Sequence, residues 1–148
     1  MSSKIQIGYI DVRVFAHATE DVDRVLCAVR NILSLELVDV VAFKRTNLMG
    51  HYGNPIILFE TRIKEENTAK MVFERLSLGL SMLDKELLSS EIGQHLDKGN
   101  LYVRLDKQSA YLNEFKLSSA DSIHLRIHFK KHSQEEVVDI CRKFGLLP

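Results

Sequence analysis

Three segments of the chain alternate apolar and polar side chains with the two-residue period of a half-buried β-strand. In residues 5–17, one face of the strand carries Val12, Val14 and Ala16, and the other carries Asp11, Arg13, Phe15 and His17. The same period recurs in residues 101–106 and, most clearly, in residues 123–129. Each segment therefore predicts a strand with one buried face and one face that carries polar side chains.

Two further runs, residues 38–45 and 55–63, are rich in β-branched and aromatic side chains. They are separated by TNLMGHYGN, whose two glycines and Asn-Pro step interrupt both strands. This arrangement predicts a hairpin with a long loop. Residues 109–117 could add a short hairpin that turns at Asn113 and Glu114.

Three segments show the helical spacing of three and four residues between apolar positions. Residues 22–33 carry one such stripe, and a second stripe begins at Glu65 and is interrupted at Gly79. A last helix has Ser133 as its N-cap and Gly145 at its end. The order of elements predicts an α+β fold, with a mainly antiparallel sheet of about five strands and helices packed on one face. The other face should be at least partly open.

The composition fits one folded domain over residues 1–148. Hydrophobic residues make up 45% of the chain and charged residues 27%, and 20 basic residues balance 20 acidic ones. A chain of this kind buries a core without a disulfide or a metal, so Cys27 and Cys141 are expected to be reduced thiols. No apolar run approaches the roughly 18 residues of a membrane span, so we expect a soluble, cytoplasmic protein without a cofactor.

The charges are unevenly distributed, although they sum to zero. Residues 98–132 carry 7 basic and 3 acidic groups. The polar faces of the strands in this region, with the first strand, present Arg13, Phe15, Tyr102, Arg104, His124, Arg126, His128 and Lys130. Such a mixture of guanidinium, imidazole and aromatic groups can hold phosphates and stack single-stranded bases. The alternative is a face that is only solvated, or one that a partner subunit covers in a homodimer.

The histidines and the missing motifs argue against a metal site and against catalysis. His124, His128 and His132 recur every fourth residue, but in a strand such side chains begin about 13 Å apart, too far for one ion. Nucleophile-elbow, phosphate-loop and zinc-hydrolase motifs are missing from the sequence. His51 could act as a base, but a lone loop histidine is more often a surface residue. No catalytic or metal-binding residue is predicted.

Two segments supply further candidate contacts for RNA. In GHYGNP, Gly50 and Gly53 would allow the backbone to form a phosphate-binding nest, with His51 and Tyr52 at its tip. In RLDKQ, Arg104 and Lys107 provide cations and Gln108 can read a base edge. Equally, the glycines could serve only the turn, and Arg104 could pair with Asp106. The predicted RNA-binding residues are Arg13, Arg45, His51, Tyr52, Asn54, Arg104, Lys107, Gln108, Arg126 and His128.

The segments GHYGNPI (Gly50 to Ile56) and LYVRLDKQSAY (Leu101 to Tyr111), with HATED from His17 to Asp21, resemble the signature stretches of a known archaeal family. Its members are described as predicted exosome-associated RNA-binding proteins. The resemblance implies a fold similar to that of the ribosomal protein that binds 5S ribosomal RNA. It also implies RNA as the ligand, and exosome or ribosome-related proteins as partners. We therefore expect a non-catalytic RNA-binding module that serves as an adaptor to the RNA-processing exosome. The alternative is a protein interaction or homodimerisation module with no nucleic-acid ligand.

Overall fold

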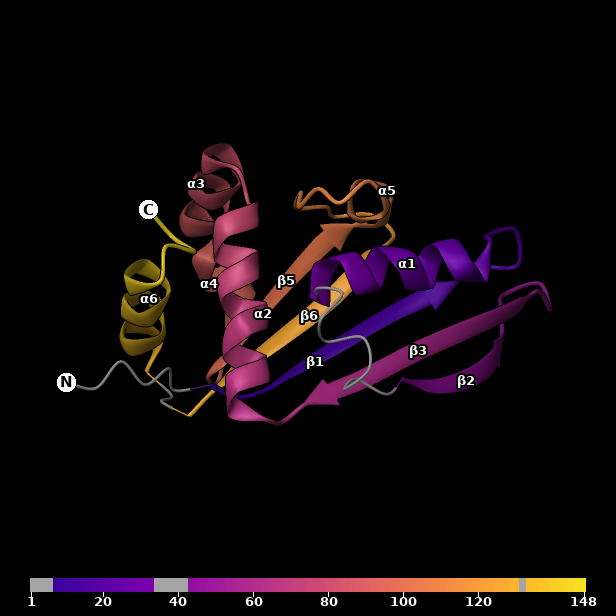
Figure 1. Ribbon diagram of the computed structural model, residues 1–148, viewed down its shortest axis with the longest axis horizontal. Coiled ribbons are helices and arrows are strands. Elements are labelled where there is room, and N and C mark those ends of the chain that lie inside the picture. The colour runs from indigo at the N-terminus through magenta and orange to yellow at the C-terminus, as the bar shows by residue number, and fades with distance from the viewer. Residues whose placement is uncertain (1–6, 34–42, 131–132) are drawn as a thin grey trace.

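The computed structural model describes residues 7–33, 43–130 and 133–148, which form a sheet with helices on one side (Figure 1). The strand order is β2-β3-β1-β6-β5-β4, and every neighbouring pair is antiparallel. The strands are β1 (Ile7–Ala16), β2 (Lys44–Met49), β3 (Pro55–Ile63), β4 (Leu96–Asp97), β5 (Asn100–Asp106) and β6 (Ser122–Phe129). The helices are α1 (Val22–Leu33), α2 (Glu66–Gly79), α3 (Met82–Ser90), α4 (Ile92–His95), α5 (Lys107–Tyr111) and α6 (Gln134–Lys143).

The core lies between the sheet and the helices that cover it. In Figure 1, α1 and α2 cross the near side of the sheet, and α3, α4 and α6 gather at one end. The inward positions of β1, β5 and β6 are almost fully buried, as the alternation predicted: Val12, Val14, Leu101, Val103, Leu105, Ile123, Leu125, Ile127 and Phe129. The α+β class and the antiparallel sheet are therefore confirmed.

The sheet has six strands in the described residues, where about five were predicted. The additional strand, β4, has two residues and pairs with the start of β5, so it is too short to show an alternation in sequence. The first strand of the predicted hairpin is also shifted: β2 begins at Lys44 and includes the TNLM stretch that we placed in the loop. Residues 38–42 of that predicted strand lie outside the described residues.

The predicted hairpin over residues 109–117 is wrong, because this stretch begins with α5. The Asp106 carboxylate caps the helix by accepting hydrogen bonds from the Ser109 backbone N–H at 2.9 Å and from its hydroxyl at 2.8 Å. Asn31 of α1 then holds the new helix, since its side-chain amide donates to the carbonyl oxygens of Ala110 and Tyr111. The turn at Asn113 does occur, with a φ of 64°.

The predicted interruption at Gly79 is confirmed, because α2 ends there and Ser81 caps α3. A side chain at position 79 would meet the ring of Phe115 at 2.6 Å, so the close approach of that ring requires glycine. Ser133 caps α6 as predicted, and Gly145 follows it with a φ of 82°.

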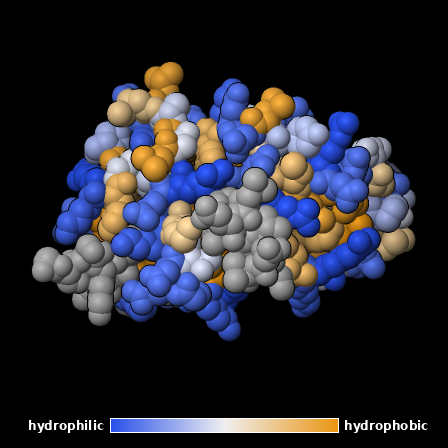
Figure 2. Space-filling model, viewed as in Figure 1, coloured by the Kyte–Doolittle hydropathy of each residue, from blue (hydrophilic) through white to orange (hydrophobic). Residues whose placement is uncertain are grey.

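Several large apolar side chains at the junction of α2 and α3 point into solvent. Leu78 is 86% exposed and Leu83 is 78% exposed, and Met82 and Leu87 accompany them. Figure 2 shows hydrophobic side chains gathered over this part of the molecule. We call these four residues the α2–α3 corner. Leu83 and Leu87 belong to α3, which begins after the break at Gly79.

Both cysteines are free thiols, and burial raises the pKa of Cys141 to about 12. In the described part of the chain, no helix is both long and apolar enough to cross a membrane.

Candidate nucleic-acid interface

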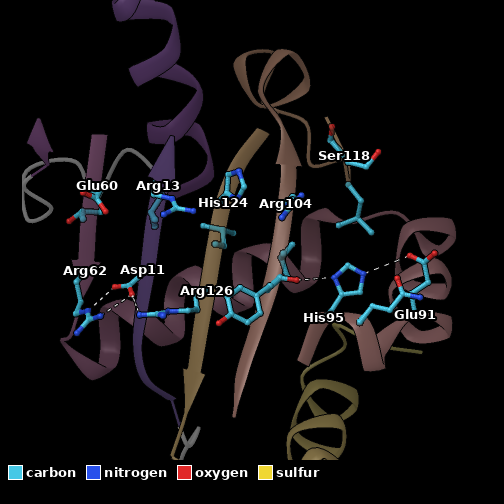
Figure 3. Close-up of a pocket in the computed structure, with 18 of the residues that line it drawn as sticks. Asp11, Arg13, Glu60, Arg62, Glu91, His95, Arg104, Ser118, His124 and Arg126 are labelled. Carbon is cyan, nitrogen blue, oxygen red and sulfur yellow. Dashed lines mark hydrogen bonds and ion pairs between the residues drawn. The ribbon is translucent and has the colours of Figure 1, made fainter. Parts of the chain in front are cut away.

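The sheet face opposite the helices is hollowed into a trough of about 1230 Å³ (Figure 3). Its floor consists of side chains from the central strands that are out of phase with the core. One wall is built by α4 and by residues 117–119. The strand periodicity predicted this face for four residues: Arg13, Arg104, Arg126 and His128. We call it the helix-free face, because α1 and α2 pack on the other side and α4 only borders it. The four side chains do not, however, share one environment.

One row of side chains crosses the floor from β2 to β5. The register pairs Lys44 with Glu60, Glu60 with Arg13, Arg13 with His124, and His124 with Arg104. We call these five residues the Arg13 row. Neighbouring strands lie about 4.8 Å apart, so the row brings side chains from five strands into one line.

The cations of the Arg13 row have no ionic partner among the described residues. Arg13, Lys44 and Arg104 are exposed, and none makes an ion pair or side-chain hydrogen bond within residues 7–33, 43–130 and 133–148. Glu60 is the one carboxylate in the row, and its side chain forms no ion pair with a described residue either. The row therefore carries three cationic side chains against one anionic side chain, each available to a ligand.

His124 lies between the two arginines of this row. Burial lowers the pKa of its imidazole, and the positive charges of Arg104 and Arg13 lower it further; Lys107 acts in the same direction, and Asp121 opposes them. The ring is therefore mostly neutral at pH 7. A bound anion would offset the two guanidinium charges and favour protonation.

In the next row of side chains on the same face, a carboxylate neutralises part of the positive charge of two arginines. Asp11 accepts hydrogen bonds from Arg62 at 2.7 and 3.0 Å and from Arg126 at 2.6 Å (Figure 3). Burial raises the pKa of Asp11, but the hydrogen bonds and charges of the two arginines outweigh this effect and hold the pKa below its ordinary value. Arg126 thus lies on the predicted face, yet its guanidinium is already bound to a carboxylate.

His128 belongs to a third row and is also engaged. Its ring stacks on Tyr9 at 4.6 Å, and Nδ1 lies 2.8 Å from the side-chain oxygen of Asn100. The guanidinium of Arg62 lies 4.0 Å from the centre of the Tyr9 ring. These contacts hold His128 and Tyr9 in the floor of the sheet.

The wall beside β5 is fixed by His95 of α4. Its Nδ1 donates a hydrogen bond to the Tyr102 carbonyl oxygen at 2.9 Å, and its Nε2 lies 3.7 Å from a Glu91 oxygen (Figure 3). The Tyr102 side chain is partly exposed beside this wall. A bound base could stack on its ring.

Lys107 requires a correction, because its side chain is buried and its ammonium is bound to other parts of the fold. Its Nζ donates to the Phe15 carbonyl oxygen, to Glu20 at 3.1 Å and to Asp121 at 2.8 Å. Only 11% of the Lys107 side chain is exposed, so this ammonium joins parts of the fold and is not available to a ligand. His17, Glu20 and Asp121 have the spacing of metal ligands, but the Lys107 ammonium occupies the cation position between the two carboxylates.

Two further predicted residues lie away from the Arg13 row. Arg45 pairs in register with the buried Phe59 and lies 5.8 Å from the centre of that ring, so it belongs to the opposite face of the sheet. Gln108 is exposed on α5, which packs against α1 on the helix side. Asp106 caps α5 and forms no ion pair with Arg104.

The glycine loop between β2 and β3 is exposed as predicted. Tyr52 is 87% exposed, and His51 and Asn54 are also exposed. Gly53 has a φ of 77°, which is the conformation for which glycine was expected. The backbone N–H groups of Gly50 and Gly53 both bond within the loop, to the Asn54 and Gly50 carbonyl oxygens, so these two groups do not form the predicted nest. The loop lies at the end of the β2–β3 hairpin in Figure 1.

Lys44 and the α4 wall were not predicted from the sequence. Lys44 enters the Arg13 row through the β2–β3 register, and the run around it does not alternate clearly enough to reveal that register. Its position as the next-to-last residue of the predicted strand over residues 38–45 was the available signal.

The comparisons with known proteins agree on one family. A family model described as RNA binding matches residues 9–129. An RNA-binding protein of Pyrococcus abyssi is 36% identical over 149 residues, which cover 97% of each chain.

Solved structures of two archaeal DUF54 proteins have the same fold. The protein from Archaeoglobus fulgidus has a TM-score of 0.78 and 26% identity, with coverage of 93% of this chain and 99% of the other. The protein from Methanothermobacter thermautotrophicus has a TM-score of 0.76 and 26% identity, with coverage of 94% and 98%. The match over most of its length shows that the chain belongs to this RNA-binding family, which has members in archaea.

Proposed function

We propose that the helix-free face binds RNA without catalysing a reaction, and that the Arg13 row makes the main phosphate contacts. The observation that carries this proposal is the difference between neighbouring rows. No carboxylate of the described residues binds Arg13 or Arg104, whereas Arg62 and Arg126 share Asp11. Unpaired guanidinium groups on an exposed surface are the usual contacts for a phosphate backbone.

Homodimerisation through the same face is less favourable. A two-fold interface places the same patch of each subunit against its copy. The Arg13 row would then bring two sets of three cations together with one carboxylate each. Such a contact between like charges is unfavourable when water is excluded.

A role as an adaptor to the exosome or to ribosome-related proteins rests on the family resemblance alone. We include this role in the proposal. We also propose that the fold is similar to that of the ribosomal protein that binds 5S ribosomal RNA, and that the protein is cytoplasmic. The adaptor role predicts that the tagged chain retains exosome subunits on affinity purification after nuclease treatment. Their absence from the eluate would contradict it.

The RNA proposal is tested by the salt dependence of binding to an unstructured oligouridylate. For the variant Arg13→Gln/Arg104→Gln we expect a loss of about tenfold to a hundredfold in affinity at low salt. The slope of log affinity against log salt should flatten by about 1.4, because each phosphate contact on a single strand contributes roughly 0.7. Fluorescence anisotropy at several chloride concentrations measures both quantities.

The matched control is Arg30→Gln/Arg142→Gln, which removes two exposed arginines from α1 and α6. This control variant has the same net charge as the test variant. Its slope of log affinity against log salt should stay steeper than that of the test variant. If the wild-type chain does not bind RNA at low salt, or if both double variants behave alike, the helix-free face is not the RNA-binding surface.

A pH dependence should follow from His124. A phosphate bound beside the ring raises its pKa in the complex, so binding takes up a proton. Affinity should therefore rise as the pH falls from 8 towards 6 and level off below the lowered pKa of the free protein. We expect a gain of about threefold to tenfold across this range, measured with the same oligonucleotide.

The variant His124→Gln keeps a hydrogen-bonding side chain but cannot titrate, so it isolates this effect from the other histidines. Its affinity at pH 8 should be close to that of the wild type, and the gain at pH 6 should largely disappear. An unchanged pH profile in His124→Gln would show that the ring does not face the bound phosphate.

A further inference from the structure

The Arg13 row runs from the outermost strand of the sheet, β2, to a wall beside β5. Lys44 lies on β2 at the outer side of the sheet. Beyond Arg104 the floor meets the wall formed by α4 and residues 117–119 (Figure 3). An extended ligand that lies along the row from Lys44 therefore meets the wall after Arg104.

The two sides of the row offer a polyanion fewer free donors than the row itself. On one side, two residues along β1, Arg62 and Arg126 are already bound by the Asp11 carboxylate. On the other side lie the apolar side chains of Phe15 and Leu58, which are paired across β1 and β3. A phosphate backbone lying along the strands would approach one or the other. A backbone lying along the row would meet the cations instead.

The wall itself disfavours a continuing phosphate backbone. Glu91, the N-cap residue of α4, lines the trough, and the nearest ionic partner of its carboxylate among the described residues is His95 at 3.7 Å. A second phosphate beyond Arg104 would approach this carboxylate. The favourable position for the last phosphate is therefore over Arg13, His124 and Arg104.

These three side chains come from three adjacent strands, with His124 in the centre (Figure 3). Across two strand spacings the arginine Cα positions are about 10 Å apart, and a guanidinium can reach inward from each side. A terminal phosphomonoester offers three free oxygens and up to two negative charges, with a second pKa of about 6. An internal phosphodiester offers two free oxygens and one charge.

We infer that Arg13, His124 and Arg104 form a binding site for a terminal phosphomonoester of RNA, at the end of the row beside the wall. This inference rests on the RNA-binding function proposed above and specifies the part of the RNA that the site prefers. The geometry does not distinguish a 5′-phosphate from a 3′-phosphate, since both present the same group.

The test compares three oligouridylates of equal length that carry a 5′-phosphate, a 3′-phosphate or hydroxyls at both ends. An internal fluorophore leaves both ends free for binding to the full chain at pH 7. One of the two phosphorylated ends should increase affinity by about tenfold over the hydroxyl-ended RNA, because the site gains charge-assisted hydrogen bonds. In Arg13→Gln and in Arg104→Gln this preference should fall to about twofold or less.

Arg30→Gln serves as the matched control and should keep the full preference, and thermal unfolding verifies that each variant is folded. Equal affinity for the three oligonucleotides, with binding still weakened by Arg104→Gln, would overturn the terminal-phosphate site and leave the RNA-binding face intact. A preference for one end that persists in both arginine variants would also overturn the site. If neither variant affects any of the three affinities, both the site and the proposed RNA face are wrong.

Discussion

Replacing Lys107 by methionine should lower the free energy of unfolding by about 2–3 kcal/mol. Its ammonium joins the β1 backbone at Phe15 to the carboxylates of Glu20 and Asp121. Methionine fills a similar volume but leaves these acceptors without their donor. The two carboxylates are partly exposed, so water recovers some of the loss and the cost lies below that of a fully buried pair. Urea unfolding followed by circular dichroism measures the difference.

Lys116→Met is the matched control, because Lys116 is exposed and pairs with Glu114 at the surface. Its unfolding free energy should change by less than about 0.5 kcal/mol. Equal stability of the two variants would contradict a structural role for Lys107.

The stability of the protein at low pH should also depend on the contact between Lys107 and Asp121. Burial raises the pKa of Asp121, but Lys107 and His17 outweigh this and hold it below its ordinary value of 3.8. The contact therefore stabilises the fold above that value and is lost as the pH falls through the lowered pKa. Lys107→Met should lose less stability than the wild type below about pH 4.

Phe73→Ala should lower the free energy of unfolding by about 3–5 kcal/mol, the largest effect that we expect from one substitution. Phe73 of α2 is fully buried, and its ring meets those of Phe129 and Phe144 edge to face, each at 5.9 Å. The truncation leaves a cavity between the sheet, α2 and the end of α6. Thermal and urea unfolding provide the measurement.

Phe73→Leu keeps most of the volume and removes only the ring contacts, so it should cost about 1–1.5 kcal/mol. A similar loss in both variants would show that the cavity is not the source of the effect.

Strand periodicity was sufficient to place residues on the two faces of the central strands. Alternation over residues 123–129 put His124, Arg126 and His128 on one face, and the structure has them there. No such argument was available for β2, because residues 38–45 do not alternate clearly, and the faces of Lys44 and Arg45 follow only from the pairing with β3. Register depends on pairing with β3, which a single run of sequence does not encode.

Lys107 shows a second limit of sequence periodicity. The alternation of β5 ends at Asp106, because that carboxylate caps α5 and changes the direction of the backbone. The next side chain then points to Phe15, Glu20 and Asp121, which lie 92, 87 and 14 residues away. Contacts over such separations arise from the tertiary fold. Likewise, the difference between unpaired Arg13 and paired Arg126 depends on which row contains Asp11.

The exposed leucines of the α2–α3 corner give the molecule a second response to salt, opposite in direction to that of the Arg13 row. Added ions screen the arginines, whereas sulfate and phosphate strengthen contacts between apolar surfaces. Phosphate would in addition compete directly for the arginines. The choice of anion therefore separates the two surfaces in solution: chloride acts mainly on the cations, and sulfate acts on both.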